Sequence, residues 1–250
     1  MSEISGKTII VTGASGGIGR ALALALAGEK AGLVLNARNP EGLEKIAEEC
    51  KKEGNRIDLL PGSAASPEVA GELVKKAIAL GTFYGFIQAA GVLHPGPAVW
   101  DLSGAEFCEI LEASVTASFE MARAAFPHLI EAGGGVAVFF GSGAAERVIP
   151  GMGAYCAAKA AEEHLVRNLA AETPEIVSFV FRPGIVNTPM VQSAIRAQGR
   201  ASKGLREQFS AYERNDEILD PMVPARALVS ILGKNPRQFH GKIATWRDGV

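Results

Sequence analysis

The chain has few cysteines and few histidines, and neither residue type is spaced to bind a metal. Its 250 residues include three cysteines, Cys50, Cys108 and Cys156, which are odd in number and far apart. The four histidines are also far apart, with no pair at i and i+4. We therefore expect reduced thiols, as in a cytoplasmic protein, and no metal site.

The chain also lacks a charge imbalance, a run of like charge and an uninterrupted apolar segment of membrane-spanning length. Its formal net charge is −2, so no basic surface for nucleic acid is indicated. Residues 80–100 carry no Asp, Glu, Lys or Arg, but Gly, Pro, Gln and His interrupt them, which favours a buried strand and a loop over a membrane span. Met-Ser-Glu at the start runs almost directly into an apolar strand, so we expect no signal peptide. Neither nucleic acid nor a membrane is predicted as a partner.

Apolar residues are abundant, and they occur in short runs that alternate with helix-like segments. Hydrophobic residues make up 48% of the chain and charged residues 21%, which is typical of a globular protein with a sizeable core. The runs are continuous, as expected of parallel strands buried on both faces. The predicted strands are 7–11, 32–36, 56–60, 84–88, 135–140, 176–181 and 241–246. The predicted helices are 17–29, 40–53, 66–80, 104–131, 152–172 and 222–233.

Alternation of strands and helices predicts an α/β fold, with a doubly wound parallel sheet and helices on both faces. No linker or repeat divides the chain, so we expect one domain over residues 1–250. Such sheets bind ligands beyond the carboxyl ends of their strands. The stretch from Met190 to Asp220 is polar and irregular. We expect a substrate flap near residues 189–220 that covers the ligand site.

A glycine-rich loop joins the first predicted strand to the first predicted helix. Residues 8–20 read TIIVTGASGGIGR and contain Gly13, Gly17 and Gly19. Glycines let the backbone turn tightly and approach a pyrophosphate, and the helix N-terminus offers unpaired N–H groups to the phosphates. A plain strand-to-helix turn is the alternative. The position of the loop in the first strand–helix unit favours a dinucleotide site.

The residues at the end of the second predicted strand indicate which dinucleotide the site binds. A carboxylate at this point would bind the ribose 2′-hydroxyl of NAD and repel a 2′-phosphate. The sequence Asn36-Ala37-Arg38-Asn39 has no carboxylate here, and Arg38 offers a guanidinium that suits a phosphate. The sequence therefore predicts NADP(H) as the cofactor. A solvent-exposed Arg38 without a ligand is the alternative.

The segment GMGAYCAAKAAE, residues 151–162, places a phenol and an ammonium in a helix otherwise rich in small residues. Tyr155 and Lys159 are four positions apart and share one helix face. A phenol can protonate the alkoxide left by hydride transfer to a carbonyl, and a nearby ammonium favours its phenolate form. Ser142 follows an apolar strand at the sheet edge where ligands bind. The alternatives are that Tyr155 and Lys159 are an incidental pair on a helix and that Ser142 only stabilises a turn. Catalytic roles are favoured because these residues occur together with the glycine loop and Arg38.

Five motifs in this order resemble those of the short-chain dehydrogenase/reductase family: TGASGGIG, AAG at 89–91, Ser142, Tyr155-Cys-Ala-Ala-Lys159, and RPGIVNTPM at 182–190. The resemblance covers essentially the whole chain. It implies one Rossmann-type domain with a seven-stranded parallel sheet, and a homodimer or homotetramer formed through two long helices. A weaker likeness, in IVNTPMVQSAIR and GKIATWRDGV, is to the branch containing sepiapterin reductase and benzil reductase. That branch implies reduction of carbonyls, often vicinal diketones, with NADPH.

The resemblance also implies residue roles. Tyr155 would be the acid/base, Lys159 would hold the nicotinamide ribose and favour the phenolate, and Ser142 would hydrogen-bond the substrate carbonyl. The residues implied to contact the cofactor are Gly13, Ser15, Gly17, Ile18 and Gly19 at the pyrophosphate, Arg38, Asn39 and Ser63 at the adenosine end, Ala90 and Gly91 beneath the ribose, Tyr155 and Lys159, and Pro183, Gly184, Val186 and Thr188 at the nicotinamide.

Three positions depart from the family pattern. Ser114 stands where the family has Asn in the long helix, near a water that connects the lysine to solvent, so Ser114 is expected to take part in that relay. Gln88 begins Gln-Ala-Ala-Gly instead of Asn-Asn-Ala-Gly, which loses an amide that ties strands together. Ser63 replaces an Asp near the adenine, which should weaken a contact with an adenine N–H.

These departures leave two classes of function open. One is an NADPH-dependent oxidoreductase that reduces a ketone or diketone carbonyl to an alcohol, or catalyses the reverse, on a small-molecule substrate. The other is an NADP(H)-binding sensor or structural protein with little turnover. Because Ser142, Tyr155 and Lys159 are all present, we predict the enzyme.

Overall fold

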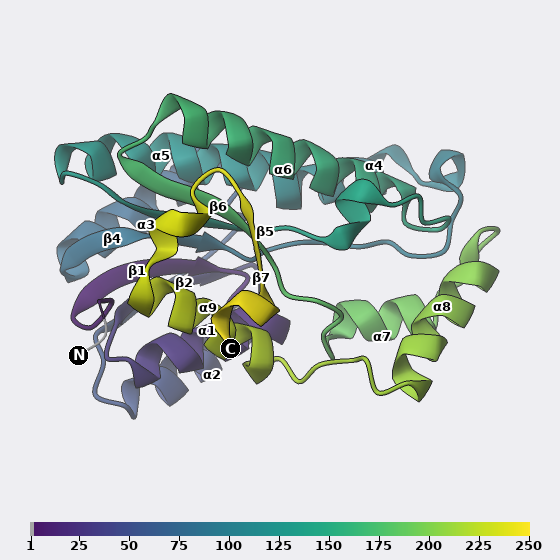
Figure 1. Ribbon diagram of the computed structural model, residues 1–250, viewed down its shortest axis with the longest axis horizontal. Coiled ribbons are helices and arrows are strands. Elements are labelled where there is room, and N and C mark those ends of the chain that lie inside the picture. Colours follow the sequence, from purple (N-terminus) through teal and green to yellow (C-terminus); the bar gives the residue numbers. More distant parts are fainter. Residues whose placement is uncertain (1–2) are drawn as a thin grey trace.

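The computed structural model describes residues 3–250, which form a seven-stranded parallel sheet flanked by helices (Figure 1). The strands are β1 Lys7–Thr12, β2 Gly32–Ala37, β3 Ile57–Pro61, β4 Thr82–Gln88, β5 Gly135–Phe140, β6 Ile176–Arg182 and β7 Ile243–Thr245. Their order is β3-β2-β1-β4-β5-β6-β7, and every neighbouring pair is parallel. The predicted Rossmann-type doubly wound sheet is therefore confirmed. Its order reverses between β1 and β4, which is where such sheets bind ligands.

Helices pack against both faces of the sheet (Figure 1). They are α1 Gly17–Gly28, α2 Pro40–Lys51, α3 Pro67–Leu80, α4 Gly104–Leu111, α5 Ala117–Glu131, α6 Gly153–Glu172, α7 Pro189–Ile195, α8 Ser202–Arg214 and α9 Met222–Lys234. Helices α1, α2 and α9 share one buried cluster with the sheet, and α3, α5 and α6 share another. The two clusters are the two halves of a three-layer core.

The continuous apolar strands explain this double-sided core. Side chains of successive strand residues point to opposite faces, so Ile9 and Val11 of β1 join one cluster while Ile10 joins the other. All three are fully buried, and each contributes about 1.5–3 kcal/mol by burial. On the second face the rings of Phe86 and Phe139 pack edge to face, 5.4 Å apart.

The predicted single helix over 104–131 is wrong in its middle. A π-helical turn, η2 Glu112–Thr116, separates α4 from α5. The extra residue of a π turn changes which backbone carbonyls are bonded within the helix. Here Ala113 O accepts a hydrogen bond from the side chain of Gln88 at 3.1 Å. This contact from β4 gives the turn a tertiary partner that helix periodicity does not reveal.

The polar segment from Met190 to Asp220, whose helical content the sequence left open, is largely helical. Helix α7 begins after Thr188, whose hydroxyl accepts a hydrogen bond from Val191 N. Helix α8 is amphipathic and buries Leu205 and Phe209. Both helices lie at one end of the molecule, away from the layered sheet (Figure 1). Among residues 3–250, no helix is long and apolar enough to cross a membrane.

Candidate active site

The glycine loop after β1 folds tightly against itself and against the chain that follows β4. Gly13 has φ of +66°, and a Cβ there would lie 2.9 Å from Ala90 Cα after β4. A Cβ on Gly19 would collide with the carbonyl oxygen of Gly13. Helix α1 begins after Gly16, which offers no side-chain cap, so its first N–H groups are left for another acceptor. The loop therefore has the close approach and the open donors that a pyrophosphate requires.

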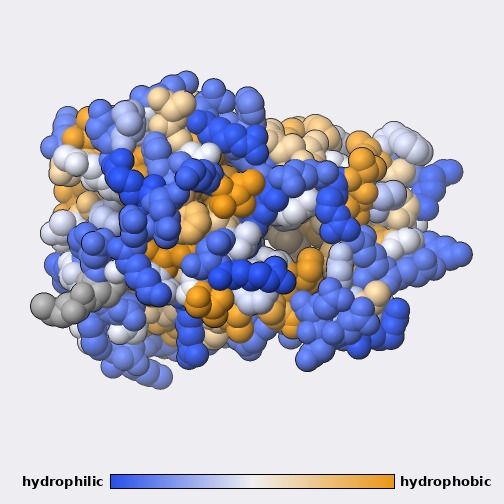
Figure 2. Space-filling view, viewed as in Figure 1, coloured by the Kyte–Doolittle hydropathy of each residue, from blue (hydrophilic) through white to orange (hydrophobic). Residues whose placement is uncertain are grey.

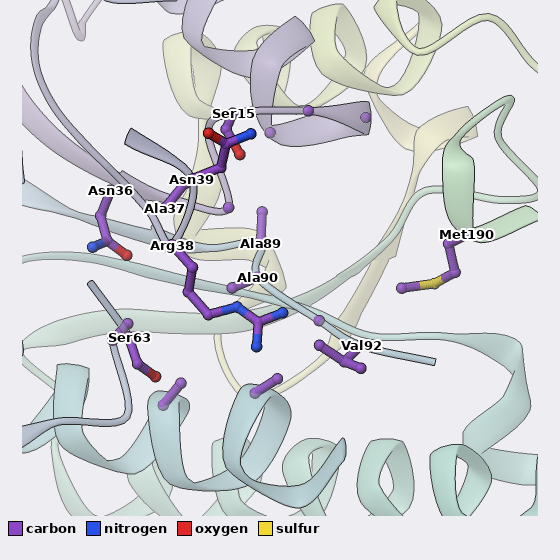
Figure 3. Close-up of a pocket in the computed structure, with 18 of the residues that line it drawn as sticks. Ser15, Asn36, Ala37, Arg38, Asn39, Ser63, Ala89, Ala90, Val92 and Met190 are labelled. Atoms are coloured by element: carbon purple, nitrogen blue, oxygen red, sulfur yellow. The ribbon is translucent and has the colours of Figure 1, made fainter. Parts of the chain in front are cut away.

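A cavity of about 430 Å³ lies over this loop at the switch in strand order. Figure 3 shows Arg38 reaching from the end of β2 across the cavity towards Ala90 and Val92, while Asn39 lies beside Ser15. Most residues predicted for the pyrophosphate, adenosine and ribose line it: Gly13, Ser15, Gly17, Ile18, Gly19, Arg38, Asn39, Ser63, Ala90 and Gly91. Small residues, open N–H groups and one guanidinium together fit a phosphorylated dinucleotide.

Two polar residues predicted for the adenosine end are engaged within the chain. Asn39 Oδ1 accepts a hydrogen bond from Gly42 N at 3.2 Å and caps α2. Ser63 Oγ accepts one from Ala65 N at 3.3 Å. Both line the cavity, yet both also stabilise local turns.

Arg38 has a partner that the sequence reasoning missed. Its Nη1 lies 2.6 Å from Oε1 of Glu109 on α4, and the other oxygen of Glu109 lies 2.8 Å from Nε2 of His94. Hydrogen bonds from Arg38 and then from His94 hold the pKa of the Glu109 carboxyl below its usual range. Glu109 lines the same cavity. A 2′-phosphate at Arg38 would therefore meet a carboxylate already in place.

A second cavity, of about 360 Å³, continues from the first. The two share several lining residues, including Ile18, Gly91 and Thr188. Figure 2 shows a hollow beside the region of α7 and α8, with apolar atoms within it and hydrophilic residues along its rim. The residues predicted for the chemistry and for the nicotinamide that line the second cavity are Ser142, Tyr155, Pro183, Gly184, Val186 and Thr188.

Lys159 lies behind Tyr155 on α6 and lines neither cavity. Its ammonium is 5.7 Å from the centre of the Tyr155 ring. It donates hydrogen bonds to Phe140 O at 2.8 Å and to Glu162 Oε2 at 2.6 Å. A lysine ammonium has three N–H groups, so these two partners leave one of them unused.

The carboxylate paired with Lys159 is itself fully buried. Glu162 accepts a second hydrogen bond, from Ser118 Oγ of α5 at 2.7 Å. Burial raises the pKa of the Glu162 carboxyl. Burial alone would lower the pKa of Lys159, but the charge of Glu162 raises it overall. The result is a desolvated ion pair one helical turn from Tyr155.

Glu163, the next residue, positions Ser142. Its Oε1 accepts a hydrogen bond from Ser142 N at 3.2 Å, and both its oxygens are held by Arg182 at 2.9 and 2.6 Å. Ser142 Oγ accepts a weak bond from Ala144 N at 3.2 Å, as a turn serine does. Ser142 thus lies at the ligand-binding edge of the sheet, as predicted, and its hydroxyl also stabilises the turn that follows.

Two departures from the family pattern have structural outcomes. Ser114 lies in the π turn, fully buried, and among the described residues its Oγ has no hydrogen-bond partner. Like Lys159 it lines neither cavity, but its π turn packs against α6, the helix that carries Tyr155 and Lys159. With Ala89 in place of the second amide, the Gln88 side chain makes the connection alone: it accepts a hydrogen bond from Thr12 Oγ1 of β1 at 2.6 Å and donates one to Ala113 O.

Several functional candidates were missed by sequence reasoning. Glu162 and Glu163 follow Lys159 by three and four positions, which is the one signal that would have suggested a shared face. The partnership of Arg38 with Glu109 joins residues far apart in the chain and left no sequence signal. Among residues 3–250, no group of three or more His, Cys, Asp or Glu side chains could hold a metal ion.

Comparison with known proteins identifies relatives over the whole chain. A family model described as short chain dehydrogenase matches residues 7–199. An uncharacterized oxidoreductase of Schizosaccharomyces pombe is 32% identical, with 100% of both chains covered. An NADPH-dependent pterin aldehyde reductase of Arabidopsis thaliana is 28% identical, with 77% of this chain and 80% of the relative covered.

Solved structures agree with these sequence relatives. A 7α-hydroxysteroid dehydrogenase, complexed with NADH and 7-oxo glycochenodeoxycholic acid, superposes with a TM-score of 0.85. The two sequences are 26% identical, and the match covers 97% of this chain and 93% of that one. The similar proteins therefore include both NADPH-dependent and NADH-bound oxidoreductases.

Proposed function

The chain belongs to the short-chain dehydrogenase family of oxidoreductases, and on that premise we propose that it reduces a ketone or diketone carbonyl to an alcohol with NADPH, or catalyses the reverse. One observation carries the proposal. Ser142 and Tyr155 line a cavity that continues into the glycine-lined cavity beside Arg38. Such an arrangement can hold a carbonyl next to the nicotinamide end of a dinucleotide.

Each residue has a definite part in this proposal. When bound, the reduced nicotinamide supplies the hydride. Ser142 Oγ donates a hydrogen bond to the substrate oxygen, and Tyr155 donates the proton that the resulting alkoxide requires. Lys159 would direct its remaining N–H towards the ribose, which requires its ammonium, buried behind Tyr155 and outside both cavities, to gain access to the cofactor. Gly184, in the turn after β6, lines the nicotinamide end.

The preference for NADP(H) over NAD(H) rests on the end of β2. Ala37 leaves no carboxylate to select a ribose 2′-hydroxyl, and Arg38 extends into the cavity (Figure 3). The NADPH-dependent pterin aldehyde reductase supports this choice and the proposed carbonyl chemistry. The NADH-bound hydroxysteroid dehydrogenase is similar in fold, so direct comparison of the two cofactors is required.

The organisation of the molecule is part of the proposal. Residues 1–250 form a single reductase domain, and α7 with α8 forms the flap near 189–220, since Val191 and Phe209 line the second cavity. Copies associate through α5 and α6 as a homodimer or homotetramer; Phe119 and Ile130 of α5 are exposed apolar residues suited to such a contact. The substrate is a small molecule, and the cytoplasmic location stays a prediction.

One observation favours the alternative, an NADP(H)-binding sensor with little turnover. The carboxylate of Glu162 offsets the charge of Lys159, so the ammonium exerts less attraction on a Tyr155 phenolate than an unpaired one would. Binding of the cofactor without turnover of any carbonyl would favour that function.

The test is oxidation of NADPH, followed by its absorbance, with vicinal diketones and simple aryl ketones as substrates. Tyr155→Phe should lower kcat by about 100-fold or more and leave NADPH affinity within about twofold. Tyr84→Phe is the matched control, because Tyr84 lies at the other end of the sheet on β4 and lines neither cavity. Full activity in Tyr155→Phe refutes the mechanism. Equal affinity for NADH and NADPH refutes the cofactor preference.

A further inference from the structure

The second cavity has charged side chains of one sign only. Arg147, Arg182 and Arg247 line it, and no Asp or Glu does among the described residues. The rest of its wall is mostly apolar. A site with unopposed guanidinium groups raises the local concentration of anions and disfavours cations.

The three arginines are not equivalent. Arg182 is held between Glu163 and Glu146, so its charge is balanced. Arg247 stacks on the Trp246 ring, with its guanidinium carbon 4.5 Å from the ring centre. Arg147 forms no ion pair with any carboxylate in the described part of the chain. Arg247 also forms no ion pair there, but its guanidinium face is covered by Trp246, so Arg147 is the cavity arginine with neither a carboxylate nor an aromatic ring against its guanidinium.

The Tyr212 hydroxyl offers a second hydrogen-bond donor beside Arg147, and the Gln208 amide helps to orient it. Gln208 Nε2 donates to the Tyr212 hydroxyl oxygen at 2.9 Å, and Arg147 Nη1 lies 3.5 Å from the same oxygen. With two donors directed at this oxygen, the hydroxyl proton of Tyr212 is left to donate elsewhere. All three residues line the cavity. A guanidinium and an O–H donor side by side suit a carboxylate.

We propose that this enzyme acts on oxo or hydroxy compounds that carry an anionic group, with Arg147 and Tyr212 binding a substrate carboxylate. The inference deepens the proposed function and rests on it for the reacting carbonyl at Ser142 and Tyr155. A single 3₁₀ turn, Gly143–Glu146, separates Ser142 from Arg147. At about 2 Å rise per residue, their backbones lie within about 10 Å of each other, so the carboxylate is separated from the carbonyl by a short chain.

The apolar wall of the cavity specifies the rest of the substrate. Ile149, Met152 and Phe209 line the cavity and are buried. Burying an apolar linker against them is favourable, whereas a polyhydroxylated one would lose its hydrogen bonds with water. The substrate class is therefore an apolar oxo acid or hydroxy acid rather than a sugar.

The test measures binding separately from turnover. Benzoylbutyrate and its methyl ester differ by one charge and are titrated into the NADP⁺ complex, in which the ketone cannot be reduced. Trp246 lines the cavity, so its fluorescence reports occupancy, and the other tryptophan, Trp100, lines neither cavity and gives a constant background. The acid should bind about tenfold or more tightly than the ester.

The variants assign that preference to one side chain. Arg147→Gln should bring acid and ester within about twofold, and Arg147→Lys should keep part of the preference. Arg214→Gln is the matched control: it removes the same charge from an exposed position on α8 that lines neither cavity. Equal binding of acid and ester by the unaltered protein, no binding of the acid, or a preference that survives Arg147→Gln overturns the proposal.

Steady-state kinetics then distinguish a failure of the anion site from a failure of the proposed reductase function. With NADPH, the acid should have a lower KM than the ester, and Arg147→Gln should raise KM for the acid alone. Reduction of neutral ketones without any preference for the acid would leave the reductase proposal standing and refute the anion site. Arg147-dependent binding of the acid without reduction of any carbonyl would do the opposite.

Discussion

Glu109→Gln should strengthen the binding of NADPH and leave the binding of NADH unchanged. In the structure, Glu109 occupies Arg38 through a 2.6 Å ion pair at the rim of the first cavity. A 2′-phosphate has to displace this carboxylate from the guanidinium or share the guanidinium with it. The neutral amide removes both the competition and the repulsion, whereas NADH has no phosphate at that point.

The expected gain in NADPH affinity can be estimated from how exposed the Arg38 and Glu109 side chains are. The side chains of Arg38 and Glu109 are 61% and 35% exposed, so breaking their pair costs only about 0.5–1 kcal/mol. Repulsion between the carboxylate and a phosphate of about two negative charges, about 6 Å apart in water, adds about 1 kcal/mol before screening. Salt reduces the second contribution by about half. Together they predict a Kd for NADPH that is about 5–10-fold lower in the variant.

The assay is titration of each cofactor by fluorescence, in a double-mutant cycle with Arg38→Ala. The gain from Glu109→Gln should be largest at low salt, and in the Arg38→Ala background only the salt-screened repulsion should remain. An unchanged Kd for NADPH in Glu109→Gln would refute the reasoning. An equal gain for NADH would also refute it, because the effect would then not act through the phosphate.

Three further predictions concern buried groups. Glu162→Ala leaves a desolvated ammonium and the Ser118 hydroxyl without their partner, so the free energy of unfolding in denaturant should fall by about 3–5 kcal/mol; a loss below about 1 kcal/mol would mean that the pair is not buried in solution. Ser114→Ala removes a buried hydroxyl with no partner and should leave stability unchanged or raise it by about 1 kcal/mol, while a large loss of kcat with normal stability would restore Ser114 to the proton relay. Burial, then a neighbouring carboxylate, raises the pKa of the Cys50 thiol to about 11. The thiol pKa is thus higher in the folded protein than in the unfolded chain. The stability that the protonated thiol contributes is fully present below the pKa of the unfolded chain, and it is lost as the pH rises through the pKa of the folded protein. The unfolding free energy should therefore fall more steeply between about pH 8 and 11 than in Cys50→Ala, and Cys108 should react with a thiol reagent before Cys50. Identical pH dependence in the two proteins would contradict this.

The sequence allowed the layers of the fold and the glycine loop to be predicted because both depend on local patterns. Continuous apolar runs place β1 and β5 in the middle of a parallel sheet, and three spaced glycines mark the approach of backbone to ligand. The motif that contains Tyr155 is local too, since four helical positions define one face. These features need no knowledge of what packs against them.

Two features that escaped prediction depend on contacts between distant segments. The π turn at Glu112–Thr116 has Gln88 of β4 as its partner, and a helical pattern over 104–131 carries no sign of it. Glu162 occupies a position on α6 that reads as a solvated glutamate in an amphipathic helix. Its burial follows only once Ser118 of α5 lies against it. The helical content between Met190 and Asp220 was left open, because the segment as a whole is polar and irregular in pattern.

Two of the carboxylates that the sequence did not reveal, Glu109 and Glu162, pair with the two cations that the proposed function uses, Arg38 and Lys159, and their different burial predicts opposite behaviour. Glu109 is partly exposed, so a ligand phosphate can take over Arg38 at small cost. Glu162 is fully buried and held by Ser118, so no ligand can replace it at Lys159 without leaving a charge unpaired in the interior. Cofactor binding should therefore rearrange the first pair and preserve the second. It follows that Lys159 acts with its charge already balanced. Its contribution is therefore a directed hydrogen bond from its single remaining N–H more than the electrostatic attraction of an unpaired charge.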